Sequence, residues 1–425
     1  MPQVKNKLTI LSILFSVLIL SFVLYKSEIV YDGLRRGNYY GYFIISLVIF
    51  FLSFVQTFLS KNNLIIYRIV FSSVFLSLYA FEFYLLNKPS DQHLQNTNKK
   101  EYYKDYVKDN PNAVSIILKN NFNVNGEEII NLGGISNRLT LNCKELDYWS
   151  DYKSDRYGFN NPDFVWDNSQ KTTFLIGDSF IHGACVKEKY TIQAKLRKFK
   201  SDINVVGLGL SKNSLISEIG LINEYTENFD VKNIFIFYSE GNDLIDLTAE
   251  YGNNILKKYL DEENFNQDLK NKQTEIDNNL IKFLDFELNR SKNSYKGTFY
   301  KFLTLYNFRN TVILPYIYTG DMDLFKRVIN RLELIQEKTN SRIFFVYMPE
   351  YFRFVVSETA NQTYKKKGEL EKIIKESKIG YIDIVEELFS KTNDPLKYFP
   401  YRRYGHYTED AYEKIAIIIK NHIQN

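Results

Sequence analysis

The chain has 425 residues, of which 45% are hydrophobic and 16% aromatic, and its formal net charge is +4. Compact domains usually have about 100–200 residues, so this length predicts one large domain and a further part. The small net charge, with no basic block interleaved with aromatics, argues against nucleic acid as a partner. The two cysteines, Cys143 and Cys185, have neither a metal nor a redox spacing, so no metal site and no cofactor are predicted.

Three long apolar stretches lie in the amino-terminal part of the chain. They cover residues 9–25, 39–60 and 64–86. Because about 20 such residues cross a bilayer, we predict a membrane anchor over residues 1–90 with three transmembrane helices. A signal peptide is the alternative for the first stretch, but no small-residue cleavage site follows Tyr25.

The Lys and Arg residues of the short loops set the expected orientation, and they nearly balance on the two sides. The positive amino terminus favours a start in the cytoplasm. Three spans then place everything after residue 86 outside it, so we expect an integral protein of the bacterial inner (cytoplasmic) membrane with a periplasmic, extracytoplasmic domain. Arg68 and Glu82 lie close to the ends of the third stretch, where long side chains reach the interface rather than catalyse.

Five short runs of β-branched and aromatic residues follow in the second part of the chain. They cover residues 171–177, 203–209, 232–240, 342–350 and 380–385. Because these runs lack alternation, we predict strands that are buried on both faces. Segments with helical spacing, such as 215–227 and 324–338, lie between them, which indicates an α/β fold with a parallel sheet and helices on both faces. Sites in such sheets form at the carboxyl ends of the strands.

Two segments interrupt this pattern of strands and helices. Residues 91–170 are rich in Asn, Lys, Asp and Tyr, which predicts a lead-in that packs on the catalytic domain rather than an independent fold. Residues 244–315 are polar at helical spacing, which predicts a helical insertion after the third strand and a candidate lid over the site. The α/β domain is therefore expected over residues 171–425.

Three polar residues lie where this architecture places a site. Ser179 follows the first strand, Asn242 follows the third, and His406 precedes the last helix. A serine nucleophile needs a base such as histidine, and an oxyanion needs amide donors. Alone, each residue also has an ordinary interpretation, as a helix cap, a turn residue or a satisfied histidine. We interpret the other histidines as structural or exposed, with His182 close enough to line the same pocket: His93, His182 and His422.

These blocks resemble the SGNH/GDSL hydrolase superfamily. The resemblance rests on "GDSF" after a buried strand, a Gly-bearing turn after the second strand, "GND" after the third and a late histidine. It covers the chain from about residue 154 onward, where "SDRYGFNNPD" is similar to the short "GF" segment of membrane-anchored members. It implies a flavodoxin-like fold, Ser179 as nucleophile and His406 as base. It also implies an oxyanion hole from the Ser179 N–H, the Asn242 side chain and a backbone N–H after the second strand.

Two positions depart from the family pattern. The Asn and Gly of the second block fall on Gly207 and Lys212, so the Lys212 N–H is the expected third donor, at a residue that carries a Cβ. The acid that usually precedes the histidine is replaced by Arg403 and Tyr404. The sequence therefore leaves open a Ser–His dyad or an acid from elsewhere, with Glu240 as one candidate.

The resemblance implies a membrane-anchored serine esterase or O-acyltransferase. Its expected substrates are acyl esters, such as O-acetyl esters, of cell-envelope glycans or lipids, and its other partner is the lipid bilayer. The alternative is a non-catalytic SGNH-like module for glycan binding or envelope assembly. Cys143 and Cys185 are either two buried thiols or a disulfide that staples the lead-in beside the site and requires an oxidising compartment.

Overall fold

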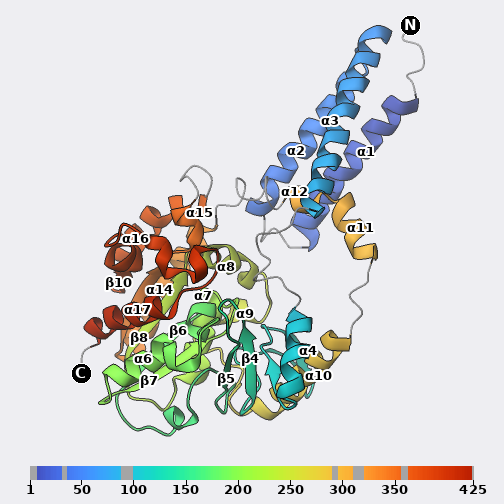
Figure 1. The fold of residues 1–425 in the computed structure, drawn as a ribbon. Helices are drawn as coiled ribbons and strands as arrows, with labels where there is room; N and C mark the ends of the chain where they lie inside the picture. The colour runs from blue at the N-terminus through green and yellow to red at the C-terminus, as the bar shows by residue number, and fades with distance from the viewer. Residues whose placement is uncertain are drawn as a thin grey trace. The chain divides into compact units, whose positions relative to one another are not determined.

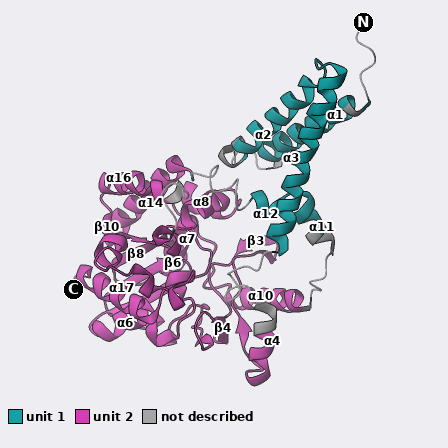
Figure 2. Cartoon of the chain, turned by 45° about the horizontal axis from the view of Figure 1, so that its top comes forward, with its two compact units in different colours: residues 1–90, 291–320, 360–362 teal, residues 91–290, 321–359, 363–425 magenta. Residues whose placement is uncertain are grey.

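The computed structural model describes residues 7–30, 36–87, 99–289, 295–309, 320–355 and 362–423. The chain forms two compact units, which Figure 2 colours separately. Unit 1 comprises residues 1–90, 291–320 and 360–362, and unit 2 comprises residues 91–290, 321–359 and 363–425.

Unit 1 contains the apolar amino-terminal helices (Figure 1). They are α1 (Lys7–Leu24), which η1 (Tyr25–Val30) continues, α2 (Arg36–Val55) and α3 (Lys61–Asn87). Among the residues that the structure describes, two helical stretches are long and apolar enough to cross a membrane: Thr9–Ile29 and Lys61–Asn87. The predicted middle span is wrong in length, because its apolar helical part is only Gly41–Val55 and a turn follows Val55. Two spanning candidates therefore replace the predicted three.

Part of the insertion also belongs to unit 1, namely α11 (Tyr295–Leu303) and α12 (Tyr306–Phe308). Glu82 of α3 is fully buried and accepts hydrogen bonds from the backbone N–H groups of Asn307, at 3.0 Å, and Phe308, at 2.7 Å. The Tyr79 hydroxyl donates to the Leu303 carbonyl at 2.9 Å. Glu82 thus anchors α12 to α3, which differs from the predicted interface-reaching side chain.

Unit 2 is built around a five-stranded parallel sheet. The strands are β6 (Thr172–Gly177), β7 (Asn204–Gly209), β8 (Val231–Ser239), β9 (Arg342–Met348) and β10 (Gly380–Asp383). Their order is β10-β9-β8-β6-β7. All five predicted runs form strands, and the first strand lies between the second and third, as the flavodoxin-like topology requires.

The sheet is covered on both faces, which explains the strand composition (Figure 1). One face packs against α7 (Leu215–Tyr225), α14 (Met322–Thr339) and α16 (Lys367–Lys375). The other packs against α6 (Ile192–Phe199) and α17 (Glu409–His422). Along β6, Phe174 and Ile176 enter the first core while Leu175 enters the second, so three consecutive positions are apolar.

In its described residues, the lead-in contains an α-helix, a short 3-10 helix (η3, Asp163–Trp166) and five short strands that the sequence analysis did not predict. The α-helix is α4 (Lys99–Asp109); β1 (Val114–Ser115), β4 (Leu139–Cys143) and β5 (Ser150–Lys153) form one sheet, and β2 (Asn121–Val124) and β3 (Glu127–Ile130) form a hairpin. Strands this short carry too few residues for a periodic signal. Between β8 and the part of the insertion in unit 1, the described chain forms α8 (Asp243–Tyr251), α9 (Leu256–Asp261) and α10 (Gln273–Asn289), with irregular chain between α9 and α10.

Candidate active site

The turn after β6 presents Ser179 at the carboxyl edge of the sheet. Asp178 is the N-cap of the short helix α5 (Ser179–His182), and its carboxylate accepts a hydrogen bond from the Phe180 N–H at 2.9 Å. Ser179 is the first helical residue, and its hydroxyl donates to Asp178 Oδ2 at 3.3 Å. Because Asp178 performs the capping, the helix-cap interpretation of Ser179 is wrong.

His406 lies in the loop before α17 and is held by a carboxylate from the lead-in. Its Nδ1 is 2.8 Å from Glu145 Oε1, and its backbone N–H donates to Glu145 Oε2, also at 2.8 Å. The Glu145 side chain is only 6% exposed. A carboxylate at Nδ1 orients the imidazole and favours the tautomer in which Nε2 can accept a proton.

Contacts between α5 and the His406 loop bring the two sides of the site together. The Phe180 ring lies 5.4 Å from the His406 ring, centroid to centroid. Burial raises the pKa of Asp178 to about 6, while the nearby His406 opposes this shift. The serine turn and the histidine–carboxylate pair therefore occupy one edge of the sheet.

The acid proposed from the sequence, Glu240, has other partners. It forms an ion pair with Arg353, whose Nε donates to both carboxylate oxygens at 2.9 Å, and it accepts a hydrogen bond from the Tyr347 hydroxyl. Glu145 takes the position beside His406 instead. Sequence reasoning missed Glu145 because it stands 261 residues before His406, in a segment without strand-like patterning.

The two remaining oxyanion candidates follow β7 and β8, the two strands that flank β6. Lys212 has φ of 66°, a left-handed conformation that favours glycine, which is the residue that the family pattern has at this position. Asn242 directs its amide nitrogen to Asp246 Oδ2 at 3.1 Å and to Asp243 Oδ1 at 3.3 Å. Donation to an oxyanion therefore requires Asn242 to release at least the longer of these contacts.

The other described histidines, His182 and His422, have contacts outside the proposed catalytic pair. His182 is buried, with Nε2 2.7 Å from the Tyr152 hydroxyl and Nδ1 3.3 Å from the Ser211 hydroxyl, so it supports the turn. The His422 ring lies 5.8 Å from the Phe344 ring, and burial lowers its pKa. His93 lies outside the described residues.

The lead-in is joined to the serine turn by a disulfide between Cys143 and Cys185. Cys143 ends β4, two residues before Glu145, and Cys185 follows α5. Cys185, Glu145 and His406 also place potential metal-ligand atoms within 4.8 Å of one another, but the Cys185 sulfur is engaged in the disulfide. The bond thus connects the segments that carry Ser179 and Glu145.

Replacing both Cys143 and Cys185 by serine should lower the free energy of unfolding by about 4 kcal/mol, as the chain-entropy estimate gives for the 42-residue separation. Ester turnover should fall as well, because Glu145 loses its covalent support. Thermal unfolding and ester turnover of the double variant, compared with wild type before and after reduction, measure both effects. If a reductant lowered ester turnover of the double variant as much as that of the wild type, the disulfide would not be the support of Glu145.

Three buried carboxyl groups lie behind the serine turn: Asp178, Glu218 and Asp243. Neither carboxylate oxygen of Glu218 has a hydrogen-bond partner among the described residues. Burial raises the pKa of Glu218 and Asp243 well above the ordinary range, and repulsion between these acids adds to the effect. The folded chain therefore retains protons that the unfolded chain loses.

We expect the stability of unit 2 to fall as the pH rises. The pKa of each of these three carboxyl groups is higher in the folded chain than in the unfolded chain. Their favourable contribution to the free energy of unfolding is therefore complete below about pH 4, and it is lost as the pH increases to 6 and beyond. Glu218→Gln should flatten this decline, measured as melting temperatures at pH 5.5 and 8.5. Glu227→Gln, on the exposed surface after α7, makes the same change in charge as a control. If the melting temperature declined with pH equally in Glu218→Gln and Glu227→Gln, Glu218 would not be a source of the pH dependence.

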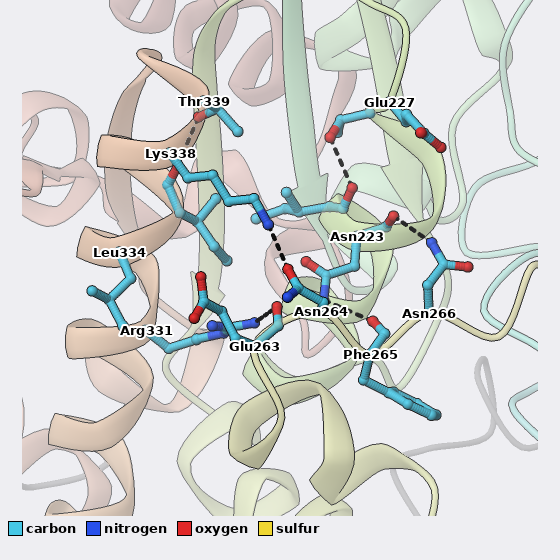
Figure 3. Close-up of a pocket in the computed structure, with 13 residues that line it drawn as sticks. Asn223, Glu227, Glu263, Asn264, Phe265, Asn266, Arg331, Leu334, Lys338 and Thr339 are labelled. Atoms are coloured by element: carbon cyan, nitrogen blue, oxygen red, sulfur yellow. Dashed lines mark hydrogen bonds between the residues drawn. The ribbon is translucent and has the colours of Figure 1, made fainter.

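A cavity of about 360 Å³ lies elsewhere in unit 2 (Figure 3). Its lining includes Asn223 and Thr226 near the end of α7, Arg331 and Lys338 of α14, and Asn264. Because α7 and α14 lead into β8 and β9, their carboxyl ends lie at the amino edge of the sheet. This cavity, with polar and apolar lining residues, is therefore on the edge opposite to Ser179.

No protein-family model matches the chain, and no curated protein matches it in sequence. Solved structures do resemble it. A member of the lipolytic protein G-D-S-L family from Veillonella parvula has 12% identity and a TM-score of 0.33, covering 58% of this chain and 94% of its own. An acetyl xylan esterase, AlAXEase, has 10% identity and a TM-score of 0.36, covering 60% and 100%. A lipase/acylhydrolase from Enterococcus faecalis has 10% identity and a TM-score of 0.33, covering 60% and 95%.

Proposed function

We propose that this protein is a serine esterase or O-acyltransferase with Ser179 as nucleophile, His406 as general base and Glu145 as the third member of the triad. The observation that carries the proposal is the double contact of Glu145 with the ring and backbone of His406. A buried carboxylate on Nδ1 is the partner that a histidine base needs and that the sequence around His406 lacks.

The reaction follows from this arrangement. Ser179 Oγ attacks the acyl carbonyl while His406 Nε2 accepts its proton, and Glu145 stabilises the resulting imidazolium. The Ser179 and Lys212 N–H groups and the Asn242 amide are the proposed donors to the oxyanion. His406 then returns the proton to the departing alcohol, which leaves an acyl-enzyme. Water completes hydrolysis, and a second hydroxyl completes transfer.

The proposed location is the extracytoplasmic side of the bacterial inner membrane. The Cys143–Cys185 disulfide supports it, because such bonds persist in oxidising compartments. With two spanning candidates instead of three, the span count no longer supports this orientation. The proposed substrates are O-acyl or O-acetyl esters of envelope glycans or lipids.

Labelling with a fluorophosphonate tests the proposal against the alternative of a non-catalytic module. The full chain in detergent should react at Ser179, as peptide mass spectrometry would show, and acyl-nitrophenyl esters of increasing chain length should then report turnover and pocket size. A protein that neither labels nor hydrolyses any of these esters would favour the binding module.

A further inference from the structure

Four side chains that can ligate a metal meet beside the proposed base: Cys143, Glu145, Cys185 and His406. His406 Nδ1 is 2.8 Å from Glu145 Oε1 and 3.8 Å from the Cys185 sulfur. The ligand atoms of Cys185, Glu145 and His406 all lie within 4.8 Å of one another, and the Cys143 sulfur is bonded to that of Cys185. We call these four residues the Cys–Glu–His cluster.

The cluster is assembled from three separate parts of the chain, which is why the spacing of the two cysteines did not reveal it. Cys143 and Glu145 come from the end of β4 and the loop after it, Cys185 follows α5, and His406 precedes α17. Cys185 is 3% exposed and the Glu145 side chain is 6% exposed, whereas the His406 side chain is 25% exposed. The cluster is therefore mostly buried and is open to solvent at the histidine.

The donor atoms of the cluster are those that zinc prefers. Two thiolates, one imidazole and one carboxylate make four ligands, which is the number in a tetrahedral structural zinc site. Magnesium and calcium prefer oxygen ligands, and the cluster offers them a single carboxylate. Because thiolates are soft ligands that favour zinc over these hard cations, the donor set selects Zn²⁺.

The distances in the cluster fit a zinc ion once the disulfide is open. Zinc holds its ligands at about 2.0–2.3 Å, so the ligand atoms of a tetrahedral site are about 3.4–3.8 Å apart. The Cys185 sulfur already has this separation from His406 Nδ1, and Glu145 Oε1 must move outward by less than about 1 Å. The two sulfurs must separate from bonding distance, which is what reduction of the disulfide does.

From this geometry we infer that the cluster binds one Zn²⁺ when the Cys143–Cys185 disulfide is reduced, and that the bound zinc blocks His406 as a base. The metal site stands on the geometry of the cluster alone, whereas the block rests on the proposed function. In the oxidised chain His406 keeps Glu145 as its partner, and in the zinc-loaded chain both side chains are ligands. The same four residues thus serve two exclusive states.

The change of state balances in electrons and protons. A dithiol gives two electrons and two protons to the disulfide, which becomes two thiols, and the dithiol is itself oxidised to a disulfide. Zinc then displaces the two thiol protons. Its bond to His406 Nδ1 moves the remaining ring proton to Nε2, so the nitrogen that has to accept the Ser179 proton already carries one.

Cobalt titration of the full chain in detergent tests the metal site, because tetrahedral thiolate-bound Co²⁺ absorbs visible light and Zn²⁺ displaces it without absorbing. After reduction with a dithiol and removal of the dithiol under nitrogen, the wild type should bind one Co²⁺ per chain. The oxidised chain should bind none. His406→Gln should weaken binding at least about 100-fold, since even residues that merely orient a ligand contribute about 10–100-fold. His422→Gln, which replaces a histidine that packs on Phe344, is the matched control and should bind like the wild type.

Three results would overturn the metal site. They are binding of Co²⁺ to the oxidised chain, binding to the reduced chain that His406→Gln leaves unchanged, and absence of binding to the reduced wild type. The second result would mean that the two thiols hold the ion without the histidine. The melting temperature of His406→Gln checks its fold, and Glu145→Gln, with the same expected loss, takes its place if that variant does not fold.

Ester turnover tests the block separately. One Zn²⁺ per chain should lower the turnover that remains after reduction by at least about 10²-fold, which is the usual contribution of a general base, and a chelator should restore it. The same Zn²⁺ should leave turnover of the oxidised chain unchanged. If the reduced chain binds the ion and keeps its turnover, the block is refuted. If the wild type hydrolyses no ester in either state, the proposed function fails, and the cobalt spectra still decide whether the metal site exists.

Discussion

Ser179→Ala should lower ester turnover by at least about 10³-fold while leaving the fold intact. The substitution removes the nucleophile, but the cap of α5 belongs to Asp178, whose bond to the Phe180 N–H does not involve the serine side chain. The melting temperature should therefore stay close to that of the wild type. Initial rates with an acyl-nitrophenyl ester and a thermal melt measure the two effects.

Ser377→Ala is a matched control for this experiment. The Ser377 hydroxyl donates to the Ile374 carbonyl at 2.6 Å, just before β10, at the amino edge of the sheet and away from Ser179. It should retain full turnover. Wild-type rates in Ser179→Ala would refute the enzyme assignment, whatever the behaviour of the control.

Glu145→Gln should lower turnover by about 10²–10⁴-fold. The glutamine oxygen can still accept the His406 N–H, so the loop should keep its shape, but a neutral amide cannot stabilise the imidazolium that forms during the reaction. In the residual activity, the acidic limb of the pH–rate profile should also move to lower pH, because the carboxylate no longer favours protonated His406. Rates measured from pH 5 to 9 test both expectations.

Glu240→Gln distinguishes a catalytic from a structural carboxylate. Glu240 is fully buried in its ion pair with Arg353, whose side chain is 19% exposed. Breaking a buried pair costs about 3–5 kcal/mol of stability, so this variant should melt earlier. If Glu240→Gln lost turnover at full stability while Glu145→Gln stayed active, the acid would be wrongly assigned.

The strands of the sheet could be predicted because burial on both faces leaves an apolar signature within a few residues. The places of Ser179 directly after β6 and of His406 just before α17 could be predicted from the sequence, and their catalytic roles stay a prediction. Glu145 could not, since only tertiary docking of the lead-in brings it to His406, and β4 beside it has just five residues. The prediction of a middle membrane span was wrong for a local reason. Its residues are apolar in composition, but the helix that they form ends at Val55.

The distance along the chain between Glu145 and His406 has a consequence for biosynthesis. The serine turn and Cys143–Cys185 emerge from the ribosome long before the histidine, which lies 261 residues after the acid. In the proposed mechanism, Ser179 has no base during that interval, so a growing or truncated chain that ends before residue 406 should not acylate itself on an ester. If the assignment is right, Ser179 becomes reactive only when the last helix has docked, so activation coincides with the completion of folding.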